Sequence, residues 1–215
     1  MANRTQGSGL RTENGVAFKI GLTGNIGCGK SAVGAMLQAL GAEYVDADRL
    51  VHDLLAAESP IVDRVAARFG REVLGADGGV DRHRLGSIVF ADPSALRDLE
   101  ALLHPAVRAE LRRRMAESTA PAIVVDAIKL IEGGLYKKVD SVWVVTCDPA
   151  DQRRRLTDLR GLTPEQAEAR IAAQPPQEAK LPFADVVIDN SGTLAATRDH
   201  VRAAWERTVG AKISP

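Results

Sequence analysis

The sequence predicts an α/β fold in which helices flank a five-stranded parallel sheet. Five short apolar runs alternate with segments of helical periodicity, and this alternation is typical of parallel sheets covered on both faces. A glycine-rich turn joins the first apolar run to the first helical segment. The chain has 215 residues, of which 45% are hydrophobic and 4% aromatic, so aliphatic side chains must fill most of the core of a single domain.

The expected strands are the five apolar runs. The first of them leads into the glycine-rich turn, and the second ends in the acidic stretch Asp46-Ala47-Asp48. Short runs bounded by turn residues and rich in Val and Ile are typical of strands buried on both faces. The five predicted ranges are 18–23, 43–46, 122–125, 139–146 and 184–189.

The helices are predicted from their start and stop signals. Ser59-Pro60 and Asp148-Pro149 each offer an N-cap followed by a first-turn proline. Thr163 and Gln166 stand at the spacing of a capping box. The expected helices are 31–40, 60–69, one from 93 that is interrupted or restarts near His104-Pro105, one from 149, one from 164, and one over 193–209.

Charge and composition narrow the functional classes. The formal net charge is zero, which argues against a dedicated nucleic-acid binder. Cys28 and Cys147 form no C-x-x-C pair, so we expect two reduced thiols rather than a zinc site or a disulfide. No apolar run approaches the roughly 20 residues of a membrane span. Residues 1–15 are polar and lack the hydrophobic core of a secretory signal, so the expected compartment is the cytoplasm.

The strongest motif is Gly24-Asn25-Ile26-Gly27-Cys28-Gly29-Lys30-Ser31, which fits G-x-x-x-x-G-K-[ST] at every fixed position. Its glycines let successive backbone N–H groups point inward, and the helix N-terminus adds partial positive charge. Lys30 can reach the β- and γ-phosphates, and the Ser31 hydroxyl can ligate Mg²⁺. The motif predicts a P-loop NTPase that binds a nucleoside triphosphate. We interpret Cys28 as a small side chain tolerated there rather than as a redox or catalytic group.

Asp46 and Asp48 stand two residues apart at the end of the second predicted strand. In an extended chain their side chains would point the same way, at the sheet edge where open α/β folds bind ligands. A carboxylate there can accept the proton of an acceptor hydroxyl or hold Mg²⁺ through water. We predict Asp48 as the base and Asp46 as metal or structural support. Asp126, at the end of the third strand, is the alternative for the metal.

Further residues from Lys19 to about Trp205 occur in an order and spacing that resemble one family. They accompany the P-loop and Asp46-Ala47-Asp48 along the chain. They include Phe69-Gly70, Asp77-Gly78, Asp81-Arg82, Leu99-Glu100, His104-Pro105, Glu132, Leu135-Tyr136-Lys137-Lys138, Gln152, Arg155, Arg170-Ile171, Gln174, Ala184-Asp185, Asn190 and Gly192. The pattern resembles the dephospho-CoA kinase family.

The resemblance implies transfer of the γ-phosphate of ATP, with Mg²⁺, to the ribose 3′-hydroxyl of dephospho-CoA, the final step of coenzyme A biosynthesis. The implied partners are ATP and dephospho-CoA, without nucleic acid or membrane, and the protein is expected as a monomer or weak homo-oligomer. We expect a disordered leader over 1–17, followed by one kinase domain over 18–215. Its expected parts are a core of about 18–50, 121–150 and 183–212, an inserted helical substrate lobe of about 51–120, and a helical lid of about 151–182.

The candidate site residues fall into four groups. Lys30 and Asp48 match the family's catalytic positions, and Ser31 and Asp46 are the candidates for the metal. The candidate ATP-binding residues are Gly24, Asn25, Ile26, Gly27, Cys28, Gly29, Lys30, Ser31, Ala32, Arg155, Asn190 and Gly192. The candidate substrate-binding residues are Asp48, Arg82, His104, Lys129 and Glu132.

Two departures from the family pattern lie on the acceptor side. The family's Pro-Leu-Leu-x-Glu is Ile-Lys-Leu-Ile-Glu here, ending at Glu132, so Lys129 stands where an apolar residue is usual. We expect Lys129 to pair with Glu132 or Asp126, to contact a phosphate, or to reach solvent. His52 stands where an arginine is usual, which removes a bidentate donor and a permanent charge.

A third departure lies in the arginine-rich helix expected after Asp148-Pro149. Successive arginines on a helix face different directions, so not all can point inward, and we favour Arg155 as the cation near the phosphates. The lid arginine usual in the family is Leu159 here, with Arg160 next to it. An α-helix turns about 100° per residue, so Arg160 can compensate only if the winding changes locally.

Two other functions stay open. Another nucleoside or nucleotide kinase would share the P-loop and the lid, but should lack the Asp-Ala-Asp and His-Pro constellation. A P-loop regulator or NTPase would hydrolyse ATP without an acceptor and without stimulation by dephospho-CoA.

Overall fold

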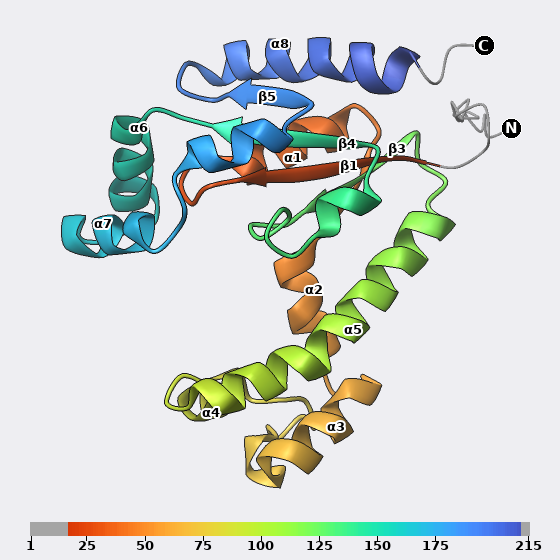
Figure 1. The fold of residues 1–215 in the computed structure, drawn as a ribbon, viewed down its shortest axis with the longest axis vertical. Coiled ribbons are helices and arrows are strands. Elements are labelled where there is room, and N and C mark those ends of the chain that lie inside the picture. Colours follow the sequence, from red (N-terminus) through yellow and green to blue (C-terminus); the bar gives the residue numbers. More distant parts are fainter. Residues whose placement is uncertain (1–16, 212–215) are drawn as a thin grey trace, which may run out of the picture. The chain divides into compact units, whose positions relative to one another are not determined.

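The computed structural model describes residues 17–211 (Figure 1). The leader expected over 1–17 lies outside the described residues, except for Ala17, which is buried. The chain divides into two compact units. One is the helical unit Asp46–Glu117, and the other contains the described residues on either side, 17–45 and 118–211.

The predicted five-stranded parallel sheet is confirmed, with strand order β2-β3-β1-β4-β5. The central strand β1 pairs with β3 and β4, and Leu22 in β1 lies opposite both Asp126 and Trp143. The glycine-rich turn after β1 therefore leaves the sheet at its carboxyl edge, beside the end of β3. The strands are β1 Phe18–Gly24, β2 Glu43–Asp46, β3 Ala122–Asp126, β4 Ser141–Thr146 and β5 Val186–Asp189.

Helices α1 (Lys30–Ala39) and α8 (Leu194–Trp205) pack against each other, and their apolar side chains join one core with those of the sheet (Figure 1). That core includes Ile20, Leu22, Val33, Leu37, Val124, Trp143, Val145, Ile188, Val201, Trp205 and Val209. This unit also contains α6 (Pro149–Arg154), α7 (Pro164–Ala172), the 3₁₀ segments Leu135–Lys138 and Gln177–Phe183, and the π-helical turns Arg155–Leu159 and Glu206–Gly210.

The unit Asp46–Glu117 has a core of its own, because its helices turn their apolar faces toward one another. The core side chains are Leu55, Ile61, Val62, Val65, Phe69, Val73, Val80, Leu85, Val89, Ala95, Leu99 and Leu103. The helices are α2 (Ala47–Leu54), α3 (Pro60–Phe69), α4 (Arg82–Val89) and α5 (Pro93–Glu117), with a 3₁₀ turn at Arg71–Val73. The predicted helical character of this region is confirmed, and its role as a substrate lobe stays a prediction.

One helix prediction was wrong, since α5 runs through His104-Pro105 without interruption or restart. Proline removes the hydrogen bond to the carbonyl four residues earlier. Both Pro105 and Ala101, which carries that carbonyl, are exposed, so water can bond the freed group. Packing of Leu99, Leu103 and Leu111 on the buried side holds the helix together across this point.

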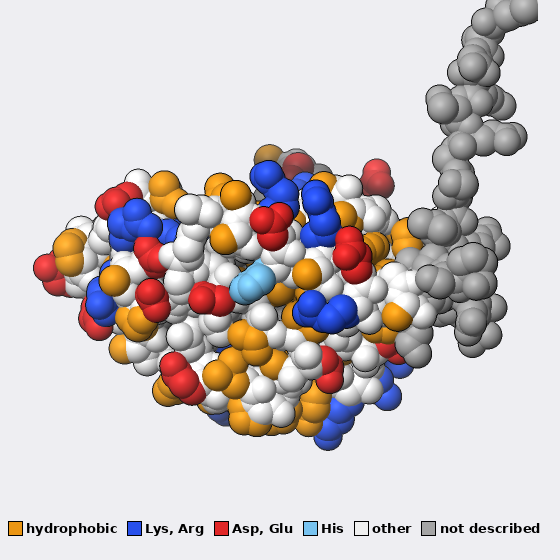
Figure 2. All heavy atoms as spheres, turned by 90° about the horizontal axis from the view of Figure 1, so that it is seen from above, with side chains coloured by type: hydrophobic (Ala, Val, Ile, Leu, Met, Phe, Trp, Pro, Cys, Tyr) orange, Lys and Arg blue, Asp and Glu red, His pale blue; other side chains and the backbone are white. Residues whose placement is uncertain are grey.

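Among the described residues, no helix combines the length and apolar character needed to cross a bilayer. Figure 2 looks onto the face that carries α8, where basic and acidic side chains are interspersed with apolar ones. This mixture agrees with the formal net charge of zero.

Candidate nucleotide-binding site

The loop between β1 and α1 needs glycine at two positions for geometric reasons. Gly29 has φ +90°, and a Cβ atom there would lie 2.2 Å from Nδ2 of Asn190. Gly24 has φ +152°, and a Cβ atom there would lie 2.4 Å from the carbonyl oxygen of Val145. Both contacts are far shorter than van der Waals distance, so no other residue fits either position without moving its neighbours.

Side chains from the segment 152–175 hold the loop from one side. Gln152 donates from Nε2 to the carbonyl of Ile26 at 2.7 Å, and the N–H of Ile26 donates to Oε1 of Gln174 at 2.8 Å. Asn25 donates from Nδ2 to the carbonyl of Pro175 at 2.8 Å. The segment predicted as the lid thus fixes both peptide groups of Ile26 in this structure.

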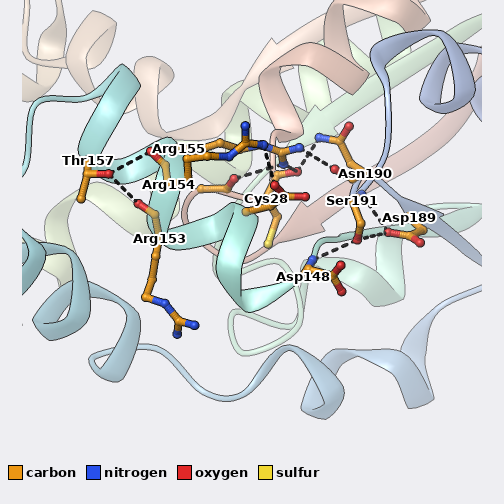
Figure 3. A network of polar contacts seen from close by, with 11 residues as sticks. Cys28, Asp148, Arg153, Arg154, Arg155, Thr157, Asp189, Asn190 and Ser191 are labelled. Carbon is orange, nitrogen blue, oxygen red and sulfur yellow. Dashed lines mark hydrogen bonds and ion pairs between the residues drawn. The ribbon is translucent and has the colours of Figure 1, made fainter.

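Arg155 and Asn190 hold the next part of the loop (Figure 3). Asn190 is buried, donates from Nδ2 to the carbonyl of Cys28 at 2.8 Å, and accepts from the Thr197 hydroxyl at 2.8 Å. Arg155 donates from Nη2 to the carbonyl of Asn190 at 2.6 Å and from Nη1 to the carbonyl of Cys28 at 3.4 Å. Both side chains therefore act on the loop carbonyls, and their direct contact with a nucleotide stays a prediction. Gly192, the third candidate beyond the loop, is exposed.

Lys30 lies beside a carboxylate at the end of β3. Its Nζ is 4.0 Å from Oδ1 of Asp126, and the two side chains are only 12% and 8% exposed. The Tyr44 hydroxyl donates to the other carboxylate oxygen, Oδ2 of Asp126, at 2.6 Å. The sheet register thus brings the P-loop lysine and a strand-end carboxylate together, although they are far apart in sequence.

The oxygen groups near the loop suit Mg²⁺, which prefers oxygen ligands and in kinases keeps several waters and phosphate oxygens. The Ser31 hydroxyl is in the first turn of α1 and exposed, and Asp126 supplies a carboxylate close to Lys30. Within residues 17–211 there is no group of three or more His, Cys, Asp or Glu side chains that could hold a metal. One hydroxyl and one carboxylate fit an ion whose remaining ligands are phosphates and water.

The extended geometry expected for Asp46 and Asp48 was wrong, because α2 begins at Ala47. Asp46 is the N-cap of that helix, and its Oδ1 accepts from the N–H of Asp48 at 2.9 Å and of Arg49 at 3.0 Å. Asp48 lies in the first turn of α2 and is exposed. Capping engages Oδ1 of Asp46, while Asp126 already accepts from Tyr44 and lies beside Lys30, so the metal roles of Asp46 and Asp126 both stay predictions. The proximity of Asp48 to the P-loop stays a prediction.

Two residues predicted to lie on the acceptor side, Arg82 and His52, contact each other within the helical unit. Nη1 of Arg82 and Nε2 of His52 are 2.6 Å apart. Since arginine only donates, Nε2 of His52 is the acceptor and the ring carries its proton on Nδ1. The histidine that replaces a family arginine therefore orients Arg82. His104 is exposed on α5.

Lys180 is a residue that the sequence analysis missed. It is buried, and its Nζ donates to the carbonyl of Ile128 at 3.3 Å and to Oε1 of Glu132 at 2.8 Å. Burial acts to raise the pKa of Glu132, but the hydrogen bond and charge of Lys180, a backbone hydrogen bond and the charge of Lys129 together leave that pKa below its ordinary value. Lys129, which was expected to pair with Glu132 or another group, is exposed. No local pattern marks Lys180, whose partners are about 50 residues away.

Replacing Lys180 with alanine should lower the free energy of unfolding by about 1–3 kcal/mol, because the Glu132 carboxylate loses a charged hydrogen-bond donor, while the Ile128 carbonyl keeps the bond from the Thr23 hydroxyl. Urea denaturation would measure the change, with Lys138→Ala as the control, because Lys138 is an exposed lysine on the 3₁₀ segment Leu135–Lys138. Because the pKa of Glu132 is depressed, its pairing stabilises the fold above the ordinary carboxyl pKa and is lost as the pH falls through the folded-state value. Equal destabilisation by both variants would contradict this assignment.

The segment predicted as the lid contains a local change of helical winding just before Arg160. Residues Arg155–Leu159 form a π-helical turn between α6 and Arg160. A π-turn contains one more residue per turn than an α-helix. Arg160 therefore lies near the helix face that residue 159 would occupy if the winding were regular. Arg153 points away from the loop in Figure 3, and Arg154 pairs with Asp151 at 2.5 Å.

These features define a class of protein. A parallel sheet of this strand order, a glycine-rich loop ending in Lys30-Ser31 and a lysine beside a strand-end carboxylate are those of a P-loop nucleotide-binding protein of the kinase type. The family model for dephospho-CoA kinase matches residues 18–196. The chain belongs to the dephospho-CoA kinase family.

Individual relatives agree with this assignment. The chain is 48% identical over 194 residues to the dephospho-CoA kinase of Symbiobacterium thermophilum, and the match covers 89% of this chain and 81% of the relative. Its fold is similar to TT1252 from Thermus thermophilus, with a TM-score of 0.75, 32% identity and coverage of 89% and 98%. It is also similar to the dephospho-CoA kinase from Campylobacter jejuni, with a TM-score of 0.67, 27% identity and coverage of 90% and 98%.

Proposed function

We propose that this protein transfers the γ-phosphoryl group of ATP to the ribose 3′-hydroxyl of dephospho-CoA, giving CoA and ADP. The observation that carries the proposal is the phosphate-binding loop, with Lys30 4.0 Å from Asp126, in a chain that matches the family over residues 18–196. The loop supports the donor half of the reaction. Family membership supports the acceptor half.

The roles of the site residues follow from the negative charge on the phosphoryl group during its transfer. Asp48 accepts the proton of the 3′-hydroxyl, whose oxygen then attacks the γ-phosphorus as the bond to the bridging oxygen of ADP breaks. Loop N–H groups and Lys30 stabilise the negative charge on the equatorial oxygens. Mg²⁺ would supply positive charge that offsets the negative charge of the phosphates, and Ser31 with Asp46 or Asp126 would hold it.

We assign the binding of dephospho-CoA, the lid function and the binding of adenine to different parts of the chain. We assign binding of dephospho-CoA to the helical unit Asp46–Glu117, through Arg82 and His104, with Glu132 and Lys129 adding contacts from the segment after β3. We assign lid function to about 151–182, and adenine binding to the neighbourhood of Asn190 and Gly192. A cytoplasmic location and a monomeric or weakly oligomeric state complete the proposal.

A panel of acceptors tests the proposed reaction. The purified protein is incubated with ATP, Mg²⁺ and either dephospho-CoA, adenosine, AMP or no acceptor, and release of ADP is coupled to NADH oxidation. We expect turnover only with dephospho-CoA, and ³¹P NMR should place the new phosphate on the 3′-oxygen. Preference for a nucleoside acceptor would indicate another kinase. ADP release at the same rate with and without dephospho-CoA would indicate an NTPase. The Lys30→Ala variant, purified in the same way, controls for contaminating kinases.

Replacing Arg160 with alanine should lower kcat/KM by about tenfold or more, or ~1.4 kcal/mol. The π-turn Arg155–Leu159 supports a place for Arg160 on the face of the missing lid arginine, where it would stabilise charge on the phosphates. Arg153→Ala is the matched control on the same segment, because Arg153 points away from the loop in Figure 3. Equal losses in the two variants would show that Arg160 has no special role.

A further inference from the structure

The only two cysteines of the chain meet at the phosphate-binding loop. Cys28 lies within the loop and Cys147 directly follows β4, 119 residues later. Their sulfur atoms are 2.9 Å apart, and the residues are 1% and 3% exposed. Both are free thiols in this structure. The expectation of two reduced thiols thus holds here, but their juxtaposition gives Cys28 a chemical partner that the sequence did not indicate.

The Sγ atoms of Cys28 and Cys147 are close enough to form a disulfide after a small movement. A disulfide has sulfur atoms about 2.05 Å apart, so the two Sγ atoms need to approach by less than about an ångström. Cys28 stands between Gly27 and Gly29, which have φ +78° and +90° and can adjust at low cost. Gly27 and Gly29 are partly exposed whereas Cys28 is buried, so a small oxidant has to pass the loop backbone to reach its sulfur.

The two thiols differ in reactivity. The Cys147 thiol donates to Sγ of Cys28, and this bond, with the positive charges of Lys30 and Arg155, lowers the pKa of Cys28 against the opposing effect of burial. The same hydrogen bond and burial raise the pKa of Cys147. Because the thiolate is the nucleophile, Cys28 reacts first and Cys147 is the resolving thiol.

We propose that Cys28 and Cys147 are an oxidative modification site, at which a hydroperoxide forms an intrachain disulfide that weakens nucleotide binding. The Cys28 thiolate attacks the peroxide oxygen, the O–O bond breaks, and hydroxide leaves to give the sulfenic acid. Sγ of Cys147 then attacks the sulfenic sulfur, and its proton leaves with the hydroxyl group as water. In sum, two thiols and one hydrogen peroxide give one disulfide and two waters.

The backbone of Cys28 links this bond to nucleotide binding. Its N–H donates to the carbonyl of Asn25 at 3.2 Å inside the loop, and its own carbonyl accepts from Asn190 and Arg155. A phosphate-binding nest requires loop N–H groups that turn toward the anion. A disulfide to Cys147 at the end of β4 would restrain the Cys28 peptide group. The Cys28 N–H would then stay hydrogen-bonded to the Asn25 carbonyl and could not turn toward the phosphates.

The test compares the full-length wild-type protein with Cys147→Ser, before and after hydrogen peroxide. Mass spectrometry of an unreduced digest should find a peptide that joins Cys28 to Cys147, absent after dithiothreitol and in the variant. Titration with a fluorescent ATP analogue should give about tenfold weaker binding for the oxidised wild type, restored by dithiothreitol. The Cys147→Ser variant should keep its affinity at the peroxide dose that crosslinks the wild type.

Three results would overturn the proposal. The first is the absence of the crosslinked peptide at any peroxide dose that leaves the fold intact by circular dichroism. The second is a crosslinked wild-type protein that binds the analogue with unchanged affinity. The third is an equal loss of affinity in Cys147→Ser, which would assign the effect to the sulfenic acid of Cys28 alone. Each readout is independent of the acceptor that the enzyme phosphorylates.

Discussion

Replacing Lys30 with alanine should lower kcat/KM for ATP by about 10²–10³-fold, or ~3–4 kcal/mol of transition-state stabilisation. Lys30 is 12% exposed, so its charge acts in a site that contains little water. The charge that builds on the γ-phosphoryl oxygens loses a positioned cation when this side chain is removed. Asp126 would also lose the ammonium 4.0 Å from its Oδ1, which leaves the carboxylate with less positive charge beside it.

Steady-state kinetics with ATP as the varied substrate would measure this loss, and circular dichroism would confirm that the variant folds. Lys138→Ala is the matched control, because Lys138 is an exposed lysine on the 3₁₀ segment Leu135–Lys138. Lys30→Arg should recover only part of the activity, since guanidinium keeps the charge but has a different shape and reach. A Lys30→Ala enzyme with more than about a tenth of wild-type kcat/KM would contradict the assignment.

Replacing Asp48 with asparagine should lower kcat by about 10²–10⁴-fold and leave ATP affinity near that of the wild type. The carboxamide has nearly the same shape as the carboxylate but cannot accept the proton of the attacking hydroxyl. The substitution should not unfold α2, because Asp46, and not Asp48, caps that helix. The expected signature is therefore a loss in kcat without a loss in nucleotide binding.

Single-turnover kinetics would separate the chemical step from product release, and nucleotide titration would report binding. Asp53→Asn is the matched control, since Asp53 is another exposed aspartate on α2. Near wild-type turnover by Asp48→Asn would remove Asp48 from the role of base. A parallel loss of ATP affinity would point instead to a role of Asp48 in holding the nucleotide or its metal.

Features carried by short stretches of sequence were predicted well. All five strands form, and Thr163 and Gln166 make the reciprocal capping box that their spacing indicated. The loop Gly24–Ser31 lies between β1 and α1, as its motif requires. Capping, strand formation and loop geometry depend on neighbours a few residues apart, so the order of residues carries their signal.

Two predictions failed for different reasons: tertiary packing outweighed a local rule at Pro105, and the local capping signal of Asp46 was overlooked. Pro105 was expected to interrupt a helix, but α5 continues because its apolar face packs on the core and the freed carbonyl is exposed. Asp46 and Asp48 were expected on extended chain, but the Asp46 carboxylate caps a helix that begins at the next residue. Only at Pro105 does the surrounding fold select between two local structures, because the bonds that cap α2 join residues two and three positions apart.

The order of residues was enough to establish the family and the phosphate-binding loop, because a P-loop is a contiguous segment whose glycines and lysine act at fixed spacing. Folding alone brings Lys180 to Glu132, Lys30 to Asp126 and Cys28 to Cys147. The last pair is 119 residues apart, and strand pairing places its members together at the carboxyl edge of the sheet. Contacts of such long range leave no periodic trace in the chain, so they emerge only when the sheet register is known.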